Sequence, residues 1–156
     1  MTTKTTKEDS NTKSFKFNQI DNSMKAYIAG PLFRKDARKI LERIDKLCRE
    51  LKLDTYLPHR DMGVYKKGDS IPFFIKNRDM IDECDFMIAY LDWKGISSGT
   101  AWEIGYAHAK KVPVIGFVED IKTAKEYDRL CIMTFNSVDL VENFNDLKDE
   151  IKGRMK

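Results

Sequence analysis

The segment SSGTAWEIGYAHAKKVPVIGF, which begins at residue 97, combines hydroxyl, glycine and carboxylate groups at the start of a helical pattern. If Ser98 is the N-cap of this helix, its hydroxyl accepts a hydrogen bond from an amide two or three residues further on. Gly99 then lets a ligand approach the backbone, and the free amides of the first turn form a cradle for an anion or a hydroxyl. Glu103 lies one turn further on, on the same side as Gly99. The spacing predicts a carboxylate beside a ligand cradle.

The pattern alone leaves a second interpretation of Glu103 open. A glutamate on a helix is usually a solvent-exposed residue without a chemical role. The neighbours of Glu103 argue for a role, because Trp102 and Ile104 are apolar and the helix has little obvious solvent face before Lys110.

Short apolar segments alternate with amphipathic segments along the rest of the chain. Runs of apolar residues bounded by Gly, Pro or charged residues predict strands, and apolar residues at spacings of three and four predict helices. The predicted strands are residues 24–30, 54–59, 85–91, 112–118 and a last one within 136–141. The predicted helices are residues 34–51, 72–83, 98–111 and 141–152, whereas residues 120–134 have no clear pattern.

This order of elements predicts an α/β fold. Strands that alternate with helices and are apolar throughout indicate a doubly wound, Rossmann- or flavodoxin-like parallel sheet of five strands, flanked by helices. Ligands of such sheets bind beyond the carboxyl ends of the strands. The loops after Ala29, Leu57, Leu91 and Phe117 should gather there, together with the cradle before Glu103.

Length and composition predict a single domain, residues 24–156, preceded by a mobile tail, residues 1–23. A chain of 156 residues with 42% hydrophobic content can bury one core. The tail is rich in Thr, Lys, Asn and Ser and has too few apolar side chains to offset the entropy of ordering it. A targeting peptide is the alternative, but the tail lacks arginine and an apolar central run.

Charge and cysteine content exclude several classes of protein. A net charge of +3 is too balanced to suggest a nucleic-acid partner, and no window is long and apolar enough to span a membrane. Cys48, Cys84 and Cys131 are far apart, with no close Cys or His partner, which argues against disulfides and a metal site and fits a cytoplasmic protein. Cys48 and Cys84 are expected as small core residues. His108 is expected at the surface or an interface.

Three segments together resemble one enzyme family. KAYIAGPLF, LPHRD and SGTAWEIGYAHAKKVPVIGF occur in the order found in the nucleoside 2-deoxyribosyltransferase family, which includes 2'-deoxynucleoside 5'-phosphate N-hydrolases. The resemblance extends from about residue 25 to residue 144. It implies that Glu103 is the nucleophile that attacks the anomeric carbon and forms a glycosyl-enzyme intermediate, resolved by a second base or by water. It implies no cofactor, and a homodimer or a higher homo-oligomer.

The resemblance also implies roles for residues of the first and third strands. The phenol of Tyr27 would hold Glu103 in its attacking rotamer, and the loop containing Gly30, Pro31 and Phe33 would form a wall of the base pocket. Asp92 would lie at the mouth of the site. The alternatives are a half-buried strand tyrosine for Tyr27, core packing for Phe33 and an ordinary loop acid for Asp92.

One departure from the family pattern concerns the 5' position of the substrate. The transferases usually carry an aspartate six residues before the nucleophile, whereas this chain has Ser97, as the nucleotide hydrolases do. A carboxylate about 4 Å from a phosphate costs roughly 4 kcal/mol per charge pair at an effective dielectric near 20. Ser97 would therefore tolerate a phosphate. Arg34, Lys35 and His59 could supply countercharge, although a solvated basic helix start is the alternative for Arg34 and Lys35.

Two further departures concern the base. Where the family often has an aspartate before the third strand, this chain has Asn77, with Asp79 two residues further on. An amide can bind the base but cannot donate a proton as a carboxylic acid does, so proton donation falls to Asp79, to water, or is not needed. Where the transferases place an asparagine two residues before a methionine, matching on Met133 gives Cys131, a weak donor.

Three functions therefore remain open. The first is cleavage of the N-glycosidic bond of a 2'-deoxynucleoside, with transfer of the sugar to another nucleobase. The second is hydrolysis of (deoxy)nucleoside 5'-monophosphates to free base and sugar phosphate. The third is a nucleotide-binding module without chemistry, against which a retained Glu103 argues, because a binding protein gains nothing from a buried carboxylate under the sugar.

Overall fold

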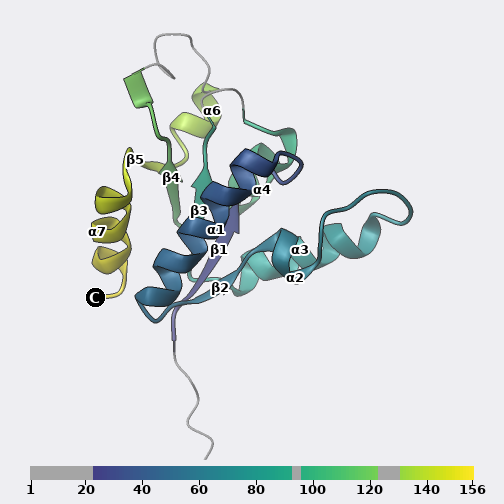
Figure 1. Cartoon of the computed structure of the whole chain (residues 1–156), viewed down its shortest axis with the longest axis horizontal. Coiled ribbons are helices and arrows are strands. Elements are labelled where there is room, and N and C mark those ends of the chain that lie inside the picture. Colours follow the sequence, from purple (N-terminus) through teal and green to yellow (C-terminus); the bar gives the residue numbers. More distant parts are fainter. Residues whose placement is uncertain (1–22, 93–95, 123–130) are drawn as a thin grey trace, which may run out of the picture.

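The computed structural model describes residues 23–92, 96–122 and 131–156. The tail predicted over residues 1–23 lies outside the described part, except for its last residue. Figure 1 shows a sheet with helices packed on both of its faces.

The described sheet has five parallel strands in the order β2-β1-β3-β4-β5. This confirms the predicted doubly wound fold. Because the order reverses between β1 and β3, the switch point at which such sheets bind ligands lies at the carboxyl ends of these two strands. The strands are β1 (Lys25–Ala29), β2 (Asp54–Tyr56), β3 (Phe86–Tyr90), β4 (Val114–Phe117) and β5 (Asp139–Val141).

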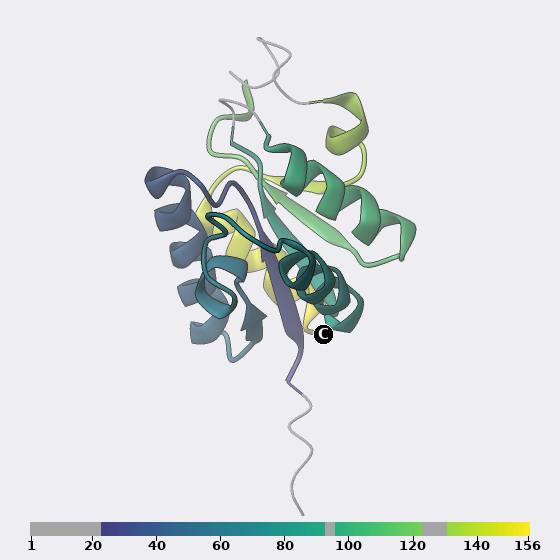
Figure 2. The same cartoon turned by 90° about the vertical axis from the view of Figure 1, so that its right-hand side faces the viewer.

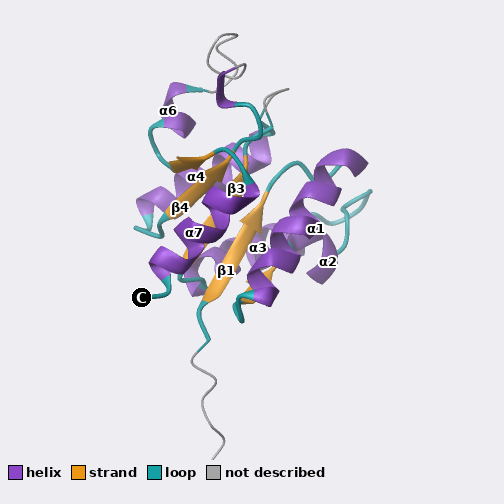
Figure 3. Cartoon of the chain, turned by 60° about the vertical axis from the view of Figure 1, so that its left-hand side comes forward, coloured by secondary structure: helices purple, strands orange, loops and turns teal. Residues whose placement is uncertain are grey.

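Two pairs of helices cover the sheet. α1 and α7 pack on one face, and α3 and α4 pack on the other, as Figures 2 and 3 show. Among the described residues, the short helices α2 and α6 lie in the connections. The helices are α1 (Lys35–Glu50), α2 (Pro58–Asp61), α3 (Ile71–Glu83), α4 (Ser98–Ala109), α6 (Ile132–Phe135) and α7 (Phe144–Arg154).

The central strand β3 is buried on both faces, as its apolar sequence predicted. Phe86, Ile88 and Tyr90 belong to the core under α1 and α7, whereas Met87 and Ala89 belong to the core under α3 and α4. The same alternation in β1 places Tyr27 under α3 and α4.

The amphipathic pattern of the first predicted helix is confirmed in α1. Its buried residues are Ala37, Leu41, Ile44 and Cys48. Cys48 is fully buried, and burial raises the pKa of its thiol to about 12. Cys84 is likewise buried with a pKa raised to about 12, so both cysteines are core residues, as expected.

The second strand is shorter than predicted. It ends at Tyr56, and Pro58 begins the short helix α2. Proline has the φ angle that suits a first helical position and no amide to donate to a sheet, so the chain turns there. The amide of Leu57 instead donates to a carboxylate oxygen of Asp61 at 2.8 Å.

Gly116 of β4 is a point of close approach between the sheet and neighbouring segments. A Cβ atom at this position would lie 2.6 Å from Val138 Cγ2 and 2.9 Å from Leu91 Cδ1. Gly116→Ala should therefore lower the free energy of unfolding by about 1–3 kcal/mol, as overpacking of a core does. Urea denaturation followed by circular dichroism would measure the change.

Gly153→Ala is the matched control, because this glycine lies in α7 with open space around its Cα. Alanine should stabilise the helix by about 0.5–1 kcal/mol at such a position. Equal effects of the two substitutions would contradict the close approach at Gly116.

Candidate active site

The core of the site is a hydrogen bond between β1 and α4. The phenol of Tyr27 donates to Glu103 Oε1 at 2.6 Å. Both residues lie on regular elements next to the switch point, so their positions do not depend on a loop. The other carboxylate oxygen of Glu103 receives no hydrogen bond from any described residue, which leaves it available to a ligand. The contact expected between Tyr27 and Glu103 is present.

The helix cap before Glu103 lies one residue earlier than predicted. Ser97, not Ser98, is the N-cap of α4. Ser97 has an extended backbone, and its Oγ accepts from the Thr100 amide at 3.2 Å and lies 2.7 Å from Thr100 Oγ1. Ser98 is instead the first helical residue. With two adjacent serines, only backbone geometry decides which one caps the helix, and the sequence pattern does not carry this information.

The environment of Glu103 makes its carboxylate a strong base for a glutamate. Burial raises its pKa to about 7, and the hydrogen bond from Tyr27 opposes this rise by favouring the charged form. Tyr27 is itself fully buried, and burial together with the charge of Glu103 raises the pKa of its phenol well above the usual value. Tyr27 therefore remains protonated and acts as a donor, while Glu103 titrates near neutral pH.

Glu103 opens into a pocket of about 400 Å³ between α3 and α4. This volume lies within the range for small-molecule sites. Three residues of α4 and three of α3 line the pocket: Gly99, Trp102, Glu103, Phe74, Asn77 and Arg78. The α3 residues stand at positions i, i+3 and i+4 and therefore share one helix face. The structure thus brings Glu103, Gly99 and Asn77 together, three of the residues predicted for the site.

Aromatic rings form the walls of this pocket. Phe74 and Trp102 meet edge to face, with their ring centroids 5.3 Å apart, and Trp102 stacks on Tyr106 with centroids 5.1 Å apart. Trp102 is 46% exposed, so α4 has a solvent-accessible face well before Lys110, contrary to the expectation from its sequence. Aromatic walls beside a carboxylate suit a ligand with a planar ring and a polar sugar.

A second tyrosine connects the pocket to the sheet. The phenol of Tyr56, from β2, donates to Asn77 Oδ1 at 2.8 Å. The rings of Tyr56 and Tyr27 lie with their centroids 5.4 Å apart. Two neighbouring strands therefore each hold one polar group of the pocket through a tyrosine.

Asp92 lies just beyond β3 and is almost fully buried. It forms an ion pair with Arg34, which also pairs with Asp36. The guanidinium predicted as a possible countercharge for a phosphate is therefore already engaged by two carboxylates. Asp92 stands at the carboxyl edge of the sheet, as expected, but it is absent from the residues that line the pocket between α3 and α4.

His59 and Asp79 also have other partners. His59 Nε2 lies 3.3 Å from Glu42 Oε1 of α1, on the other side of the sheet from α3. Asp79 accepts from Arg78 Nη2 at 2.6 Å. Neither residue lines the pocket that contains Glu103. Asp79 stands two positions after Asn77, a spacing that puts the two side chains on different faces of α3.

The loop after β1 packs against α1. A Cβ atom at Gly30 would lie 2.6 Å from Leu41 Cδ2, so only glycine fits there without a shift. Pro31 is buried, whereas Phe33 is 74% exposed. Core packing of Phe33 is therefore excluded. None of these loop residues lines the pocket between α3 and α4, and their predicted role as a wall for the base stays a prediction.

Cys131 is the N-cap residue of the short helix α6, and Met133 lies within this helix. Both residues are exposed. Within one chain they do not line the pocket of Glu103.

Four residues of the site escaped the sequence analysis: Phe74, Arg78, Trp102 and Tyr56. The spacing of Phe74, Asn77 and Arg78 on a predicted helix could have indicated a shared face. Nothing in the sequence indicates that this face meets α4, because the contact depends on how two helices pack.

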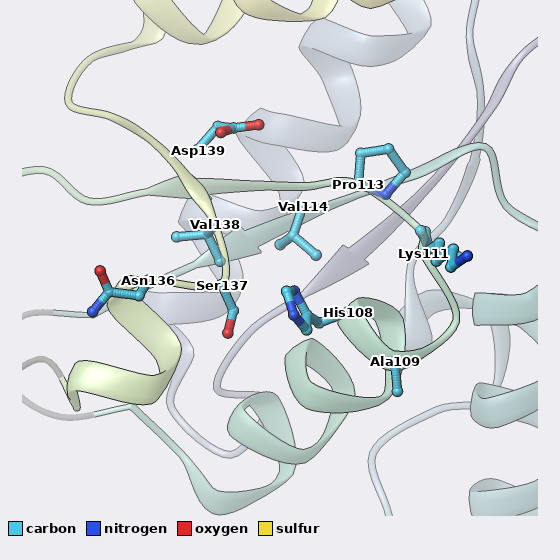
Figure 4. Close-up of a pocket in the computed structure, with 10 residues that line it drawn as sticks. His108, Ala109, Lys111, Pro113, Val114, Asn136, Ser137, Val138 and Asp139 are labelled. Carbon is cyan, nitrogen blue, oxygen red and sulfur yellow. The ribbon is translucent and has the colours of Figure 1, made fainter.

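A larger pocket, of about 630 Å³, lies elsewhere on the molecule (Figure 4). Its residues come from the end of α4 and from the amino ends of β4 and β5, including His108, Val114 and Asp139. This is the end of the sheet opposite the switch point, so the pocket is separate from Glu103. His108 is exposed, as expected.

The described part of the chain holds no group of three or more His, Cys, Asp or Glu side chains that could bind a metal ion. Among the same residues, no helix has the length and apolar character needed to cross a membrane.

Comparisons with known proteins agree with this fold. The sequence model of the family described as nucleoside 2-deoxyribosyltransferase matches residues 26–149. Curated protein sequences give no match.

Three solved structures are similar over most of their length. The 2-deoxyribosyltransferase of Bacillus psychrosaccharolyticus is 20% identical, with a TM-score of 0.68 over 80% of this chain and 90% of that chain. A 2-desoxiribosyltransferase of Leishmania mexicana is 25% identical, with a TM-score of 0.62 over 79% and 93%. The CMP N-glycosidase of Clostridium botulinum is 17% identical, with a TM-score of 0.52 over 82% and 98%. Because the family model matches residues 26–149, well over half of the chain, this chain belongs to the nucleoside 2-deoxyribosyltransferase family.

Proposed function

We propose that this protein cleaves the N-glycosidic bond of 2'-deoxynucleosides and transfers the deoxyribosyl group to another nucleobase. The observation that carries the proposal is the half-buried carboxylate of Glu103, held by Tyr27 at 2.6 Å and open to a pocket with aromatic walls. The family match supports an enzyme that acts on nucleosides or nucleotides and nucleobases.

In the first step, the charged carboxylate of Glu103 attacks C1' of the sugar. The C1'–N bond breaks, its electron pair leaves with the base, and an ester forms between the sugar and Glu103. The transition state resembles an oxocarbenium ion, which a carboxylate directly below C1' stabilises. Tyr27 restricts the carboxylate to one orientation, so less entropy is lost when it attacks.

In the second step, a ring nitrogen of the incoming base attacks C1' from the side that the first base has left, and the proton on that nitrogen passes to the hydroxide formed when water protonated the first base. The ester bond breaks and its electron pair returns to Glu103, so the carboxylate is regenerated. Two inversions retain the configuration at C1'. The first base leaves as an anion and takes a proton from water only afterwards, because the amide of Asn77 is no acid and Asp79 lies outside the pocket.

Hydrolysis of (deoxy)nucleoside 5'-monophosphates is the second candidate. The observation that favours it is Ser97, a neutral hydroxyl at the amino end of α4, where a phosphate would also meet the free amides of the first helical turn. Water would then replace the second base and release the sugar 5-phosphate. A non-catalytic binding module is the third, least favoured candidate, because burying a carboxylate costs folding free energy that binding alone does not require.

We further propose a cytoplasmic homodimer or a higher homo-oligomer that needs no cofactor and binds no nucleic acid. Its partners are nucleosides or nucleoside 5'-monophosphates and free nucleobases. Sedimentation velocity would give the oligomeric state, and a monomer at micromolar concentration would contradict this part of the proposal.

Product chromatography decides between the candidate functions. The protein is incubated with deoxynucleosides and, separately, with their 5'-monophosphates, with and without a second free base. A new nucleoside that forms only with the added base establishes transfer. Free base released from monophosphates alone establishes hydrolysis, and the absence of turnover with ligand still bound establishes a binding module.

Glu103→Gln should lower kcat about 10³-fold or more, because the amide cannot form the ester intermediate. The fold should survive. Since the folded-state pKa of about 7 exceeds the ordinary value of 4.5, the charged carboxylate costs folding free energy that grows between these pH values and reaches up to about 3 kcal/mol above them. At pH 8 the variant should therefore unfold at the same or a higher temperature. Turnover near the wild-type rate would exclude Glu103 as the nucleophile.

Tyr27→Phe should shift the pH dependence of the reaction. The wild-type kcat/KM should rise with pH and reach half of its maximum near pH 7, where Glu103 loses its proton. Without the phenol, the carboxylate loses the hydrogen bond that lowers its pKa, so the half-maximal point should move to higher pH. Tyr65→Phe is the control, since the phenol of Tyr65 donates to the Gly68 carbonyl outside the site. An unchanged profile in Tyr27→Phe would refute the role of Tyr27.

Ser97→Asp should favour unphosphorylated substrates. Aspartate is as good an N-cap as serine, so α4 should remain intact. Its charge near a phosphate costs roughly 4 kcal/mol per charge pair at about 4 Å, which predicts a large fall in kcat/KM for 5'-monophosphates and a small change for nucleosides. If the ratio of the two values of kcat/KM stays constant, Ser97 does not face the 5' position.

A further inference from the structure

The α3 wall of the pocket presents hydrogen-bond donors. Two of its residues, Asn77 and Arg78, are polar and follow one another in the chain. The chemistry of a nucleobase edge depends on its pattern of donors and acceptors. The hydrogen-bonding groups that these two side chains present therefore restrict which base can bind, provided that the pocket binds a nucleoside as proposed above.

Asn77 is held in one orientation by Tyr56. The Tyr56 phenol donates to Asn77 Oδ1 at 2.8 Å, so the carbonyl edge of the amide is turned toward β2. Tyr56 is 4% exposed, and burial raises its pKa to about 12, so it remains a protonated donor. A flipped amide could donate from its NH₂ group to the phenol oxygen, but the buried phenol proton would then have no acceptor among the described residues, so this orientation is disfavoured. The NH₂ group is thereby left to donate elsewhere, on the side away from Tyr56.

Arg78 can only donate, because a guanidinium has no acceptor. Its Nε and Nη2 atoms donate to Asp79 Oδ1 at 2.9 and 2.6 Å. Nη1 donates to no residue in the described ranges and is free to bind a ligand. The guanidinium carbon lies 5.8 Å from the centroid of the Phe74 ring, which also lines the pocket.

We propose that this pocket selects 6-oxopurines over 6-aminopurines, with Arg78 and Asn77 as specificity residues and Tyr56 as the positioning residue of Asn77. A 6-oxopurine presents two adjacent acceptors, O6 and N7, which match two adjacent donors. Adenine presents a donor and an acceptor at the same positions. An asparagine with both ends of its amide free would pair with adenine, but here the acceptor end is directed to Tyr56. Adenine would therefore bring its amino group against another donor.

The test measures binding separately from turnover. Full-length Glu103→Gln, which cannot form the ester intermediate, is titrated in a calorimeter with 2'-deoxyinosine, 2'-deoxyadenosine and the 5'-monophosphate of each. The inosine compound should bind at least about tenfold more tightly than its adenosine counterpart, as a pair of matched hydrogen bonds to a base edge provides. Equal affinities, tighter binding of the adenosine compound or no binding of either would overturn the inference.

Substitutions on the same background assign the preference to its residues. Tyr56→Phe should lower the inosine-to-adenosine affinity ratio several-fold, because it frees the amide to turn, and Arg78→Met should lower it at least as much. Tyr65→Phe and Arg49→Met, which remove the same groups from the surface, should leave the ratio unchanged. A ratio that survives both Tyr56→Phe and Arg78→Met would overturn the assignment.

The inference and the proposed function can fail separately. Wild-type protein that turns over neither purine compound, while Glu103→Gln retains the affinity ratio, would refute the proposed chemistry and support the selection of the base. Turnover of both compounds by the wild type, with equal affinities in the variant, would support the proposed chemistry and refute the selection of the base.

Discussion

The hydrogen bond from Tyr27 to Glu103 is the interaction on which the rest of the site depends. A carboxylate that is to attack a sugar carbon must be poorly solvated, because water would weaken it as a nucleophile, yet it must remain charged. Burial alone would favour the neutral, protonated form of the Glu103 side chain. The phenol of Tyr27 restores part of the lost solvation through a single bond of 2.6 Å and fixes the direction of the carboxylate.

The sheet makes this bond possible. The order β2-β1-β3-β4-β5 places β1 at the switch point, and its alternation turns Tyr27 toward α4 while its neighbours pack under α1. The next strand, β2, uses the same geometry. Because Tyr27 pairs with Tyr56 in the parallel register, the two phenols come from adjacent positions and hold Glu103 and Asn77 respectively. A shift of the β1–β2 register by one residue would turn one tyrosine to the opposite face.

The parts of this molecule that depend on local pattern were predictable from the sequence, and those that depend on packing were not. Apolar segments and helical spacing sufficed to predict the doubly wound parallel sheet, the helix α1 and the position of Glu103 on its helix. The cap at Ser97 was missed by one residue, because two adjacent serines carry the same local signal. Predicting the early end of β2, which stops at Tyr56 before Pro58, required weighing one proline against an apolar run. The pocket face of α3 was missed because its partner, α4, follows a whole strand later in the chain.

Hydrogen-bond donors on the α3 wall can compensate for the absence of a carboxylic acid at position 77. A leaving base that is not protonated departs with negative charge on its ring and carbonyl oxygen. In the proposed reaction, the NH₂ group of Asn77 and the guanidinium of Arg78 donate to the edge on which this charge accumulates. Such bonds strengthen as the C1'–N bond breaks, and stabilisation that grows toward the transition state accelerates the reaction, whereas uniform binding does not. The donors that discriminate between bases would thus also replace the missing acid, which links the choice of base to the rate of its departure.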